Sequence, residues 1–308
     1  MKFSHIPDDR LQRIRALGYD YSLQPKKWVQ SCNLCGETDE TILTHFDRYG
    51  YMVTAAGCSV CGLTFLNPMM TEAAYGDFYS RVYRPLVSAY HGRLINAQTI
   101  QDEQVEYARA LGAFVQPWIE ERRIQTLLDI GGSTGVVARE VSKMYSLEAA
   151  VLDPAANELD WAAKFGMETI TGFLEQYDSK GRQFDFVTLC QTIDHLTDSS
   201  GSLRKIRQLL SPEGLFFVDI VDFRAAYLRQ ASVEGAVKID HPYYFTEETV
   251  EAMLRRSGFS VLQKSYAVDH LHVGYICAPG EACQGSLPTR EAVREFFREV
   301  RFIQNARL

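Results

Sequence analysis

The stretch TLLDIGGSTG, residues 126–135, joins an apolar run to a glycine loop and decides how the rest of the chain is interpreted. An apolar run followed by small residues predicts a buried strand, a tight turn and a helix that begins near Val136. A second apolar run, AAVLD at residues 149–153, ends on Asp153, about 20 residues beyond the loop. A carboxylate at this position accepts hydrogen bonds from the ribose hydroxyls of an adenosine. The two features together predict a cofactor that contains a nucleoside.

Two alternatives compete with this interpretation of the loop. A dinucleotide dehydrogenase needs three glycines spaced around a pyrophosphate, and Ser133 and Thr134 do not reproduce that spacing. A tight strand-to-helix turn with a solvated aspartate would need no ligand at all. The loop and the acidic strand end occur together, and this combination favours a cofactor site.

The region from Ile124 onward alternates short apolar runs with helical segments, which predicts a parallel sheet covered on both faces by helices. Further strands are expected at residues 167–170, 184–190 and 214–221. The runs at 259–268 and 270–278 lie almost end to end, so they are expected to form an antiparallel pair at one edge of the sheet. The predicted fold class is α/β, with a Rossmann-like sheet of seven strands.

Two cysteine pairs precede the glycine loop: Cys32 and Cys35 in CNLC, and Cys58 and Cys61 in CSVC. Each pair places two thiolates on one tight knuckle, and four sulfurs complete a tetrahedral structural zinc site. Two disulfides or four unrelated thiols are the alternatives. Zinc is favoured because the chain shows no secretion signal and disulfides do not persist in a reducing compartment. A closed site of four sulfurs leaves no coordination position for catalysis.

The composition is that of an ordinary globular protein, with 308 residues of which 46% are hydrophobic. The N-terminal stretch MKFSHIPDDRLQRIRALG lacks the apolar segment of a signal peptide, and no run of about 18 apolar residues suits a membrane helix. A cytoplasmic location is therefore expected. The net charge of −7 argues against a general attraction to nucleic acid, so a small-molecule substrate is the expected partner.

The chain divides into four expected regions. These are a zinc-binding domain (1–70), a helical connector or lid (71–123), a cofactor-binding domain (124–280) and a C-terminal helix (281–308). The zinc unit has too few apolar residues to fold without its metal. Pro117 is expected to kink or end the connector helix. The apolar face of the C-terminal helix is expected to dock on its own domain or on a partner.

The glycine loop resembles the first motif of the class I S-adenosylmethionine-dependent methyltransferases, which reads acidic, any, Gly, any, Gly, any, Gly. Asp129, Gly131 and Gly135 match it, and Ser133 stands in place of the middle glycine. The resemblance implies that the loop lines the amino acid end of S-adenosylmethionine. The implied cofactor contacts are Asp129, Gly131, Gly132, Ser133 and Gly135 in the loop, Asp153 and Pro154 at the ribose, Phe173 and Leu174 near the adenine, and Cys190 and Gln191 at the next strand end.

Three further segments resemble the zinc-binding methyltransferases of sugar metabolism, of which nucleotide-sugar C-methyltransferases are the best-known members. The segments are CGLTFLNPMMTEAAYGDFY (61–79), IDHLTD (193–198) and HPYYFTEETVEAMLRRSGF (241–259). With the cysteine pairs, the resemblance spans roughly residues 30 to 280. Fuller members carry a further C-terminal α/β domain, whereas this sequence continues with one helix.

The expected catalytic residues are His195, Asp194 and His241. His195 follows the strand at 184–190, where a methyl group would emerge, and its ordinary pKa suits proton removal; a capping or core histidine is the alternative. His241 lies in a loop expected to fold over the site. Four tyrosines are expected to bind the substrate, with simple packing as the alternative: Tyr79, Tyr83, Tyr243 and Tyr244.

The leading hypothesis is a methyltransferase that acts on a sugar, nucleotide-linked, in the synthesis of a surface glycan or secondary metabolite. Transfer to carbon and transfer to oxygen both remain open. One rival is an RNA methyltransferase whose zinc ribbon grips a stem, but the acidic charge and the lack of an NPPY-type motif disfavour it. Another is a non-catalytic interaction protein with a vestigial cofactor fold.

Overall fold

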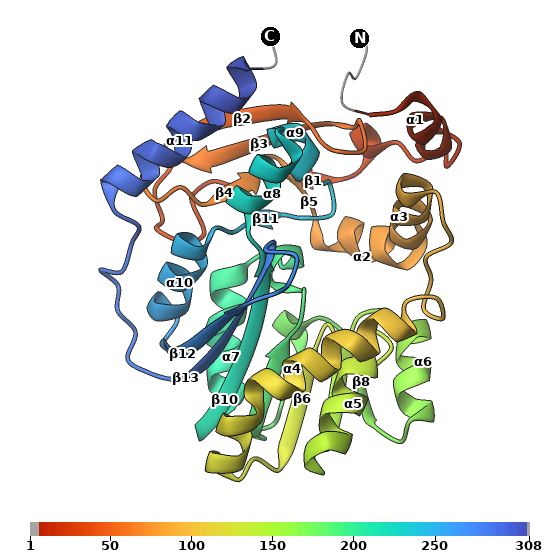
Figure 1. Cartoon of the computed structure of the whole chain (residues 1–308), viewed down its shortest axis with the longest axis vertical. Helices are drawn as coiled ribbons and strands as arrows, with labels where there is room; N and C mark the ends of the chain where they lie inside the picture. Colours follow the sequence, from red (N-terminus) through yellow and green to blue (C-terminus); the bar gives the residue numbers. More distant parts are fainter. Residues whose placement is uncertain (1–5, 307–308) are drawn as a thin grey trace.

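The computed structural model describes residues 6–306. Figure 1 shows two halves stacked along the long axis of the molecule, with a small sheet in one and a large twisted sheet flanked by helices in the other. Both ends of the described chain lie in the half that carries the small sheet.

The large sheet has seven strands in the order β12-β13-β10-β9-β6-β7-β8. The five parallel strands are β6 (Thr126–Ile130), β7 (Glu148–Asp153), β8 (Glu168–Thr171), β9 (Phe184–Leu189) and β10 (Leu210–Val221). The edge pair β12 (Phe259–Tyr266) and β13 (His272–Pro279) is antiparallel. The predicted α/β class and edge pair are therefore confirmed. Because the strand order reverses between β6 and β9, the carboxyl ends of these two strands open a crevice suited to a ligand.

Helices cover both faces of this sheet, and alternate strand residues point to one face or the other. Leu127, Val151 and Phe186 pack in one core with α4 (Gln101–Arg122), α5 (Val136–Tyr145) and α6 (Ala156–Lys164). The neighbouring strand residues Leu128, Leu152 and Val187 belong to a second core with α7 (Ser199–Leu209) and α10 (Glu247–Arg256). Among residues 6–306, no helix combines the length and the apolar character that crossing a membrane requires.

Of the two expectations for Pro117, a kink or the end of the connector helix, the second is wrong. Pro117 lies inside α4, which continues to Arg122. Proline removes one backbone hydrogen bond from a helix. The apolar face of α4, with Leu111, Val115 and Ile119 buried against the sheet, offsets that loss.

The small sheet has four strands in the order β11-β4-β3-β2. Three come from the N-terminal region: β2 (Glu40–Phe46), β3 (Met52–Cys58) and β4 (Thr64–Leu66); the fourth, β11 (Tyr243–Tyr244), comes from the segment before α10. Near this half lie α1 (Asp8–Arg15), the short pair β1 (Lys26–Lys27) and β5 (Met69–Met70), α2 (Glu72–Arg81), α3 (Tyr83–His91), α8 (Phe223–Gln230) and α9 (Val233–Ala236). Residues of both halves form one continuous core.

The last helix, α11 (Arg290–Asn305), docks on its own chain, across the small sheet (Figure 1). The Thr289 hydroxyl caps it by accepting from the backbone N–H of Ala292. Phe296 and three further apolar residues of the predicted face are buried, and Glu299 pairs with Arg224 of α8. Of the two expected docking partners, the structure therefore shows the chain itself.

Replacing Phe296 by Ala is expected to lower the free energy of unfolding by about 3 kcal/mol, because a buried aromatic ring is lost. Phe302→Ala on the same helix is the matched control, since 73% of Phe302 is exposed; its effect should stay within about 0.5 kcal/mol. Urea denaturation followed by circular dichroism measures both. Equal effects for the two variants would contradict the docking of α11.

Candidate active site and metal centre

The four paired cysteines form one cluster. The Sγ atoms of Cys32 and Cys61 lie 3.5 Å apart, as do those of Cys35 and Cys58. All four sulfurs lie within 4.8 Å of one another. Zinc–sulfur bonds of about 2.3 Å in a tetrahedron place the sulfurs about 3.8 Å apart. The cluster therefore fits a single zinc ion.

Glycines close both knuckles of this cluster. The backbone N–H of Gly36 donates to the carbonyl of Cys32, and that of Gly62 donates to the carbonyl of Cys58, both at 2.8 Å. Each glycine has a positive φ, 84° and 79° respectively, which a residue with a side chain adopts at a cost. The glycine after each cysteine pair is thus part of the metal-binding geometry.

The predicted glycine loop connects β6 to α5 at the sheet crevice. A Cβ atom on Gly132 would lie 2.6 Å from Asp129 Oδ2, and one on Gly135 would lie 2.6 Å from Met167 Cε. Ser133, which replaces the middle glycine of the motif, also adopts a positive φ of 51°. The loop therefore keeps the tight backbone path of the motif despite its serine.

Two buried carboxylates flank the loop. Burial raises the pKa of Asp153 to about 6, and its two oxygens accept from the backbone N–H groups of Ser133 and Ala155 at 2.9 and 2.8 Å. Burial raises the pKa of Asp129 to about 7; its Oδ1 accepts from Thr188, while its Oδ2 has no partner among the described residues. An unsatisfied acceptor and an acidic ribose position fit a cationic nucleoside such as S-adenosylmethionine.

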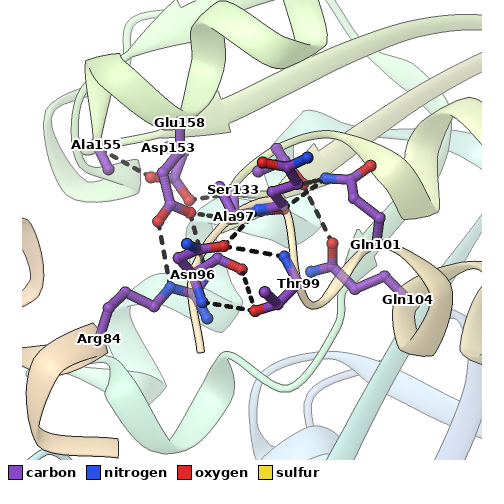
Figure 2. Close-up of polar contacts among 12 residues, drawn as sticks. Arg84, Asn96, Ala97, Thr99, Gln101, Gln104, Ser133, Asp153, Ala155 and Glu158 are labelled. Carbon is purple, nitrogen blue, oxygen red and sulfur yellow. Dashed lines mark hydrogen bonds and ion pairs between the residues drawn. The ribbon is translucent and has the colours of Figure 1, made fainter. Parts of the chain in front are cut away.

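Side chains of α3, α4 and α6 gather beside the same loop (Figure 2). Glu158 of α6 accepts from the Ser133 hydroxyl and pairs with Arg84 of α3 at 3.3 Å. The Thr134 hydroxyl donates to Gln104 at 3.1 Å, at the start of α4. Side chains of α6 and α4 therefore hold the loop through the Ser133 and Thr134 hydroxyls, and Arg84 of α3 holds Glu158 in turn.

Asp194, His195 and His241 come together at the end of β9. The first two lie in the short 3-10 helix Ile193–His195, and His241 lies in the loop before β11. His241 Nδ1 is 2.7 Å from Asp194 Oδ2, and the two imidazole rings meet edge-on with centroids 4.6 Å apart. Asp194 and His241 are buried, whereas His195 is half-buried. The three predicted catalytic residues thus form one cluster.

Lys238 contacts the second ring nitrogen of His241. The Lys238 amino group lies 3.1 Å from His241 Nε2. His241 Nδ1 faces Asp194, and its Nε2 faces both Lys238 and, at 3.4 Å, the Asp240 carboxylate. Both ring nitrogens of His241 therefore have partners within the cluster.

His195 is left with an available nitrogen. The Tyr79 hydroxyl donates to the carbonyl of Asp240 at 2.6 Å, so His195 Nδ1, 2.5 Å from Tyr79 Oη, carries the hydrogen and donates it. His195 Nε2 is then unprotonated, and Asp194 Oδ1 lies 3.8 Å away, beyond a hydrogen bond. The cluster presents one free base beside a carboxylate that stabilises the protonated form.

The charges of the cluster agree with this assignment. Burial lowers the pKa of His195 to about 4, although Asp194 opposes the shift. Burial also opposes ionisation of Asp194, but His241 and His195 hold its pKa below its usual range. At neutral pH the cluster therefore contains a neutral imidazole and an ionised carboxylate.

The same three side chains could converge on a divalent cation, because their ligand atoms lie within 4.8 Å of one another. The Lys238 amino group lies 3.1 Å from His241 Nε2 in the same buried space, and burial lowers its pKa.

The remaining predicted residues lie in three kinds of place. Tyr79 and Tyr83 face His195, with ring centroids 5.3 and 6.3 Å away. Tyr243 and Tyr244 are buried in β11, which favours the packing alternative for both. The others lie around the sheet edge: Phe173 beside Gly76 of α2, Leu174 in the core, Pro154 exposed after β7, and Cys190 and Gln191 at the end of β9.

Sequence reasoning missed four residues that hold the site: Lys238, Asp240, Arg84 and Glu158. Lys238 and Asp240 stand directly before His241 in the run KIDH, and this proximity was the one available signal. Arg84 and Glu158 are 74 residues apart, and nothing in the sequence links them.

Purified protein is expected to contain a single zinc ion per chain, and a chelator should lower its melting temperature, because metal binding contributes folding free energy. Cys58→Ser should lose the metal. Cys283→Ser is the control, since that thiol is exposed and lies outside the cluster. Elemental analysis with thermal melting provides the readout; full zinc content in Cys58→Ser would rule out this ligand set.

Comparison with known proteins agrees with the geometry. A family model described as "Methyltransferase domain" matches residues 100–264, more than half of the 308 residues. The solved plantazolicin methyltransferase BpumL, in complex with SAH and a monoazolic desmethylPZN analog, is 11% identical; the match covers 68% of this chain and 95% of BpumL, with a TM-score of 0.52.

Two other solved structures are similar at lower TM-scores. An S-adenosylmethionine-dependent methyltransferase from Clostridium acetobutylicum is 14% identical over 67% of this chain and 99% of its own, with a TM-score of 0.47. The CcbJ methyltransferase from Streptomyces caelestis is 14% identical over 56% and 90%, also at 0.47. No curated protein matches the chain. The chain belongs to the methyltransferase domain family and has the class I S-adenosylmethionine-dependent methyltransferase fold.

Proposed function

We propose that this methyltransferase acts on a sugar, nucleotide-linked, and that His195 is the base of the reaction. One observation carries the proposal. The three segments that resemble sugar methyltransferases meet in a single cluster. In it, the Tyr79 hydroxyl contacts His195 Nδ1, and the His195 ring contacts the His241 ring. The resemblance therefore concerns residues that share one site and not only residues scattered along the chain.

The cofactor side of the proposal rests on the glycine loop. When bound, S-adenosylmethionine supplies a methyl group that its sulfonium has already activated. Gly131 to Gly135 would hold its amino acid end, and Asp153 would accept from its ribose hydroxyls. Asp129, whose Oδ2 has no partner among the described residues, offers a hydrogen-bond acceptor beneath the loop.

The acceptor side needs alignment and the removal of one proton. His195 Nε2 takes that proton, and the Asp194 carboxylate stabilises the imidazolium that results. Tyr79 fixes the ring of His195, while His241 and Lys238 fix Asp194. With a carbon acceptor, a neighbouring ketone must acidify the C–H bond; with an oxygen acceptor, the same base deprotonates a hydroxyl.

The direct test is incubation with isotope-labelled cofactor and a panel of keto and hydroxy nucleotide sugars, with methyl gain read by mass spectrometry. His195→Gln is expected to lower turnover at least about 100-fold, the effect of removing a general base. Its affinity for S-adenosylmethionine, measured by calorimetry, should not change. His45→Gln, a change of an exposed histidine on β2, is the control. Full turnover in His195→Gln would remove this residue from the mechanism.

The pH dependence follows from the lowered pKa of His195. A base with a pKa of about 4 is neutral and active throughout the neutral range. The value of kcat/KM is therefore expected to be flat from about pH 6 to 8 and to fall only towards pH 4. Asp194→Asn removes the negative charge that raises the pKa of His195. The variant should therefore turn over more slowly, and the fall of its kcat/KM at acid pH should not move to a higher pH. An acid limb centred near the ordinary histidine value would contradict the assignment.

A further inference from the structure

A group of positive charges lies at one side of the proposed acceptor site. Arg10 of α1 and Arg48 of the turn between β2 and β3 both stack on the ring of Tyr90, with Cζ 4.2 and 4.0 Å from its centroid. His91 follows Tyr90 at the end of α3 and is exposed. Segments distant in the sequence thus bring two guanidinium groups onto one aromatic ring.

Neither guanidinium has a carboxylate partner among residues 6–306. The Nε atoms of Arg10 and Arg48 are both buried without a hydrogen-bond partner in that range. The carboxylate next to Arg10 in the sequence, Asp9, pairs instead with Arg13 at 2.7 Å. Two half-buried guanidinium groups side by side, with no carboxylate among residues 6–306 in ion-pair contact with either, favour a bound anion.

One acidic group nearby offsets part of this positive charge: burial opposes the charge of Arg48, but Tyr49, Tyr90 and the Asp240 carboxylate raise the pKa of Arg48 above its usual value. Asp47 precedes Arg48, but burial raises the pKa of Asp47 to about 8, which leaves it largely uncharged at neutral pH. The carboxylate of Asp240 lies against His241 at 3.4 Å, in the space that Lys238 also occupies. Burial and then the charges of Arg48, Arg93, Arg10 and Lys238 lower the pKa of His91, which indicates a positive potential at this surface.

The group is attached to the segment that builds the proposed active site. The backbone N–H of Arg48 donates to the carbonyl of Val237 at 2.9 Å, and that of Ile239 donates to Asp47 at 3.1 Å. The same segment continues to Asp240, whose carbonyl accepts from Tyr79. The turn that carries Arg48 is therefore joined by hydrogen bonds to the segment that contacts Tyr79, whose ring faces His195.

We propose that Arg10 and Arg48, with His91 at the opening, form an anion subsite that binds the phosphate groups of the methyl acceptor. A guanidinium group can donate two parallel hydrogen bonds to two oxygens of one phosphate group. Stacking on an aromatic ring fixes the orientation of the guanidinium before the phosphate binds. The inference rests on the proposed function and adds to it the residues that would hold the phosphate groups of a nucleotide-linked acceptor.

The binding test uses the full-length, zinc-loaded protein and inorganic pyrophosphate, followed by calorimetry at two salt concentrations. The wild type is expected to bind, more weakly at the higher salt. The double variant Arg10→Gln/Arg48→Gln should lose at least tenfold in affinity, and Arg10→Lys/Arg48→Lys should recover part of it. Arg182→Gln, an exposed arginine paired with Glu168 near β8, is the control and should bind as the wild type does.

Competition and turnover decide what the subsite holds. Displacement of pyrophosphate by glucose 1-phosphate indicates a monophosphate ligand, and displacement by UDP-glucose alone indicates a diphosphate; displacement by neither overturns the proposal. Equal pyrophosphate affinity in the wild type and the double glutamine variant also overturns it. Affinity for S-adenosylmethionine should be the same in all variants with wild-type melting temperatures.

The two proposals fail in distinguishable ways. If a free sugar is methylated as fast as the corresponding sugar phosphate, the proposed anion subsite is wrong, while the proposal of sugar methylation stands. If no sugar is methylated but pyrophosphate binding depends on Arg10 and Arg48, the anion subsite stands and the proposed sugar acceptor is wrong.

Discussion

The pairing of β11 with β4 is the interaction on which the rest of the structure depends. Tyr243 and Tyr244 lie opposite Phe65 and Thr64, and the backbone N–H of Leu66 donates to the carbonyl of Pro242. This short ladder attaches a segment of the methyltransferase half to the sheet of the cysteine half. With the contact between His241 and Asp194, it fixes the position of His241 relative to His195.

The cysteine cluster acts on the same ladder from the other side. Cys61 stands three residues before β4, and the knuckle that contains it is closed by the amide of Gly62. A zinc ion here would perform no chemistry, because four sulfurs complete its coordination. Its effect would be to hold β4, and through β11 the loop that carries Lys238 and His241.

The sequence predicts the parts of the fold that depend on local pattern. The buried strands, the helix that begins at Val136 and the cysteine pairs can each be recognised from a pattern of a few neighbouring residues. The rest depends on contacts between distant segments. A strand of two residues such as β11 has no period to recognise, and the contact of His241 with Lys238 depends on where the Lys238 side chain points. The continuation of α4 past Pro117 depends on packing, which overrides local preference.

The serine in the glycine loop links the two sides of the site. A glycine at position 133 would satisfy the backbone but could not donate to Glu158, which in turn pairs with Arg84. Arg84 is adjacent to Tyr83, whose ring faces His195. The first turn of α3 therefore faces the proposed base through Tyr83 and reaches the cofactor loop through Arg84 and its partner Glu158. A departure from the common motif thus has a structural reason: it fixes the acceptor side of the site to the loop that would hold the methyl donor.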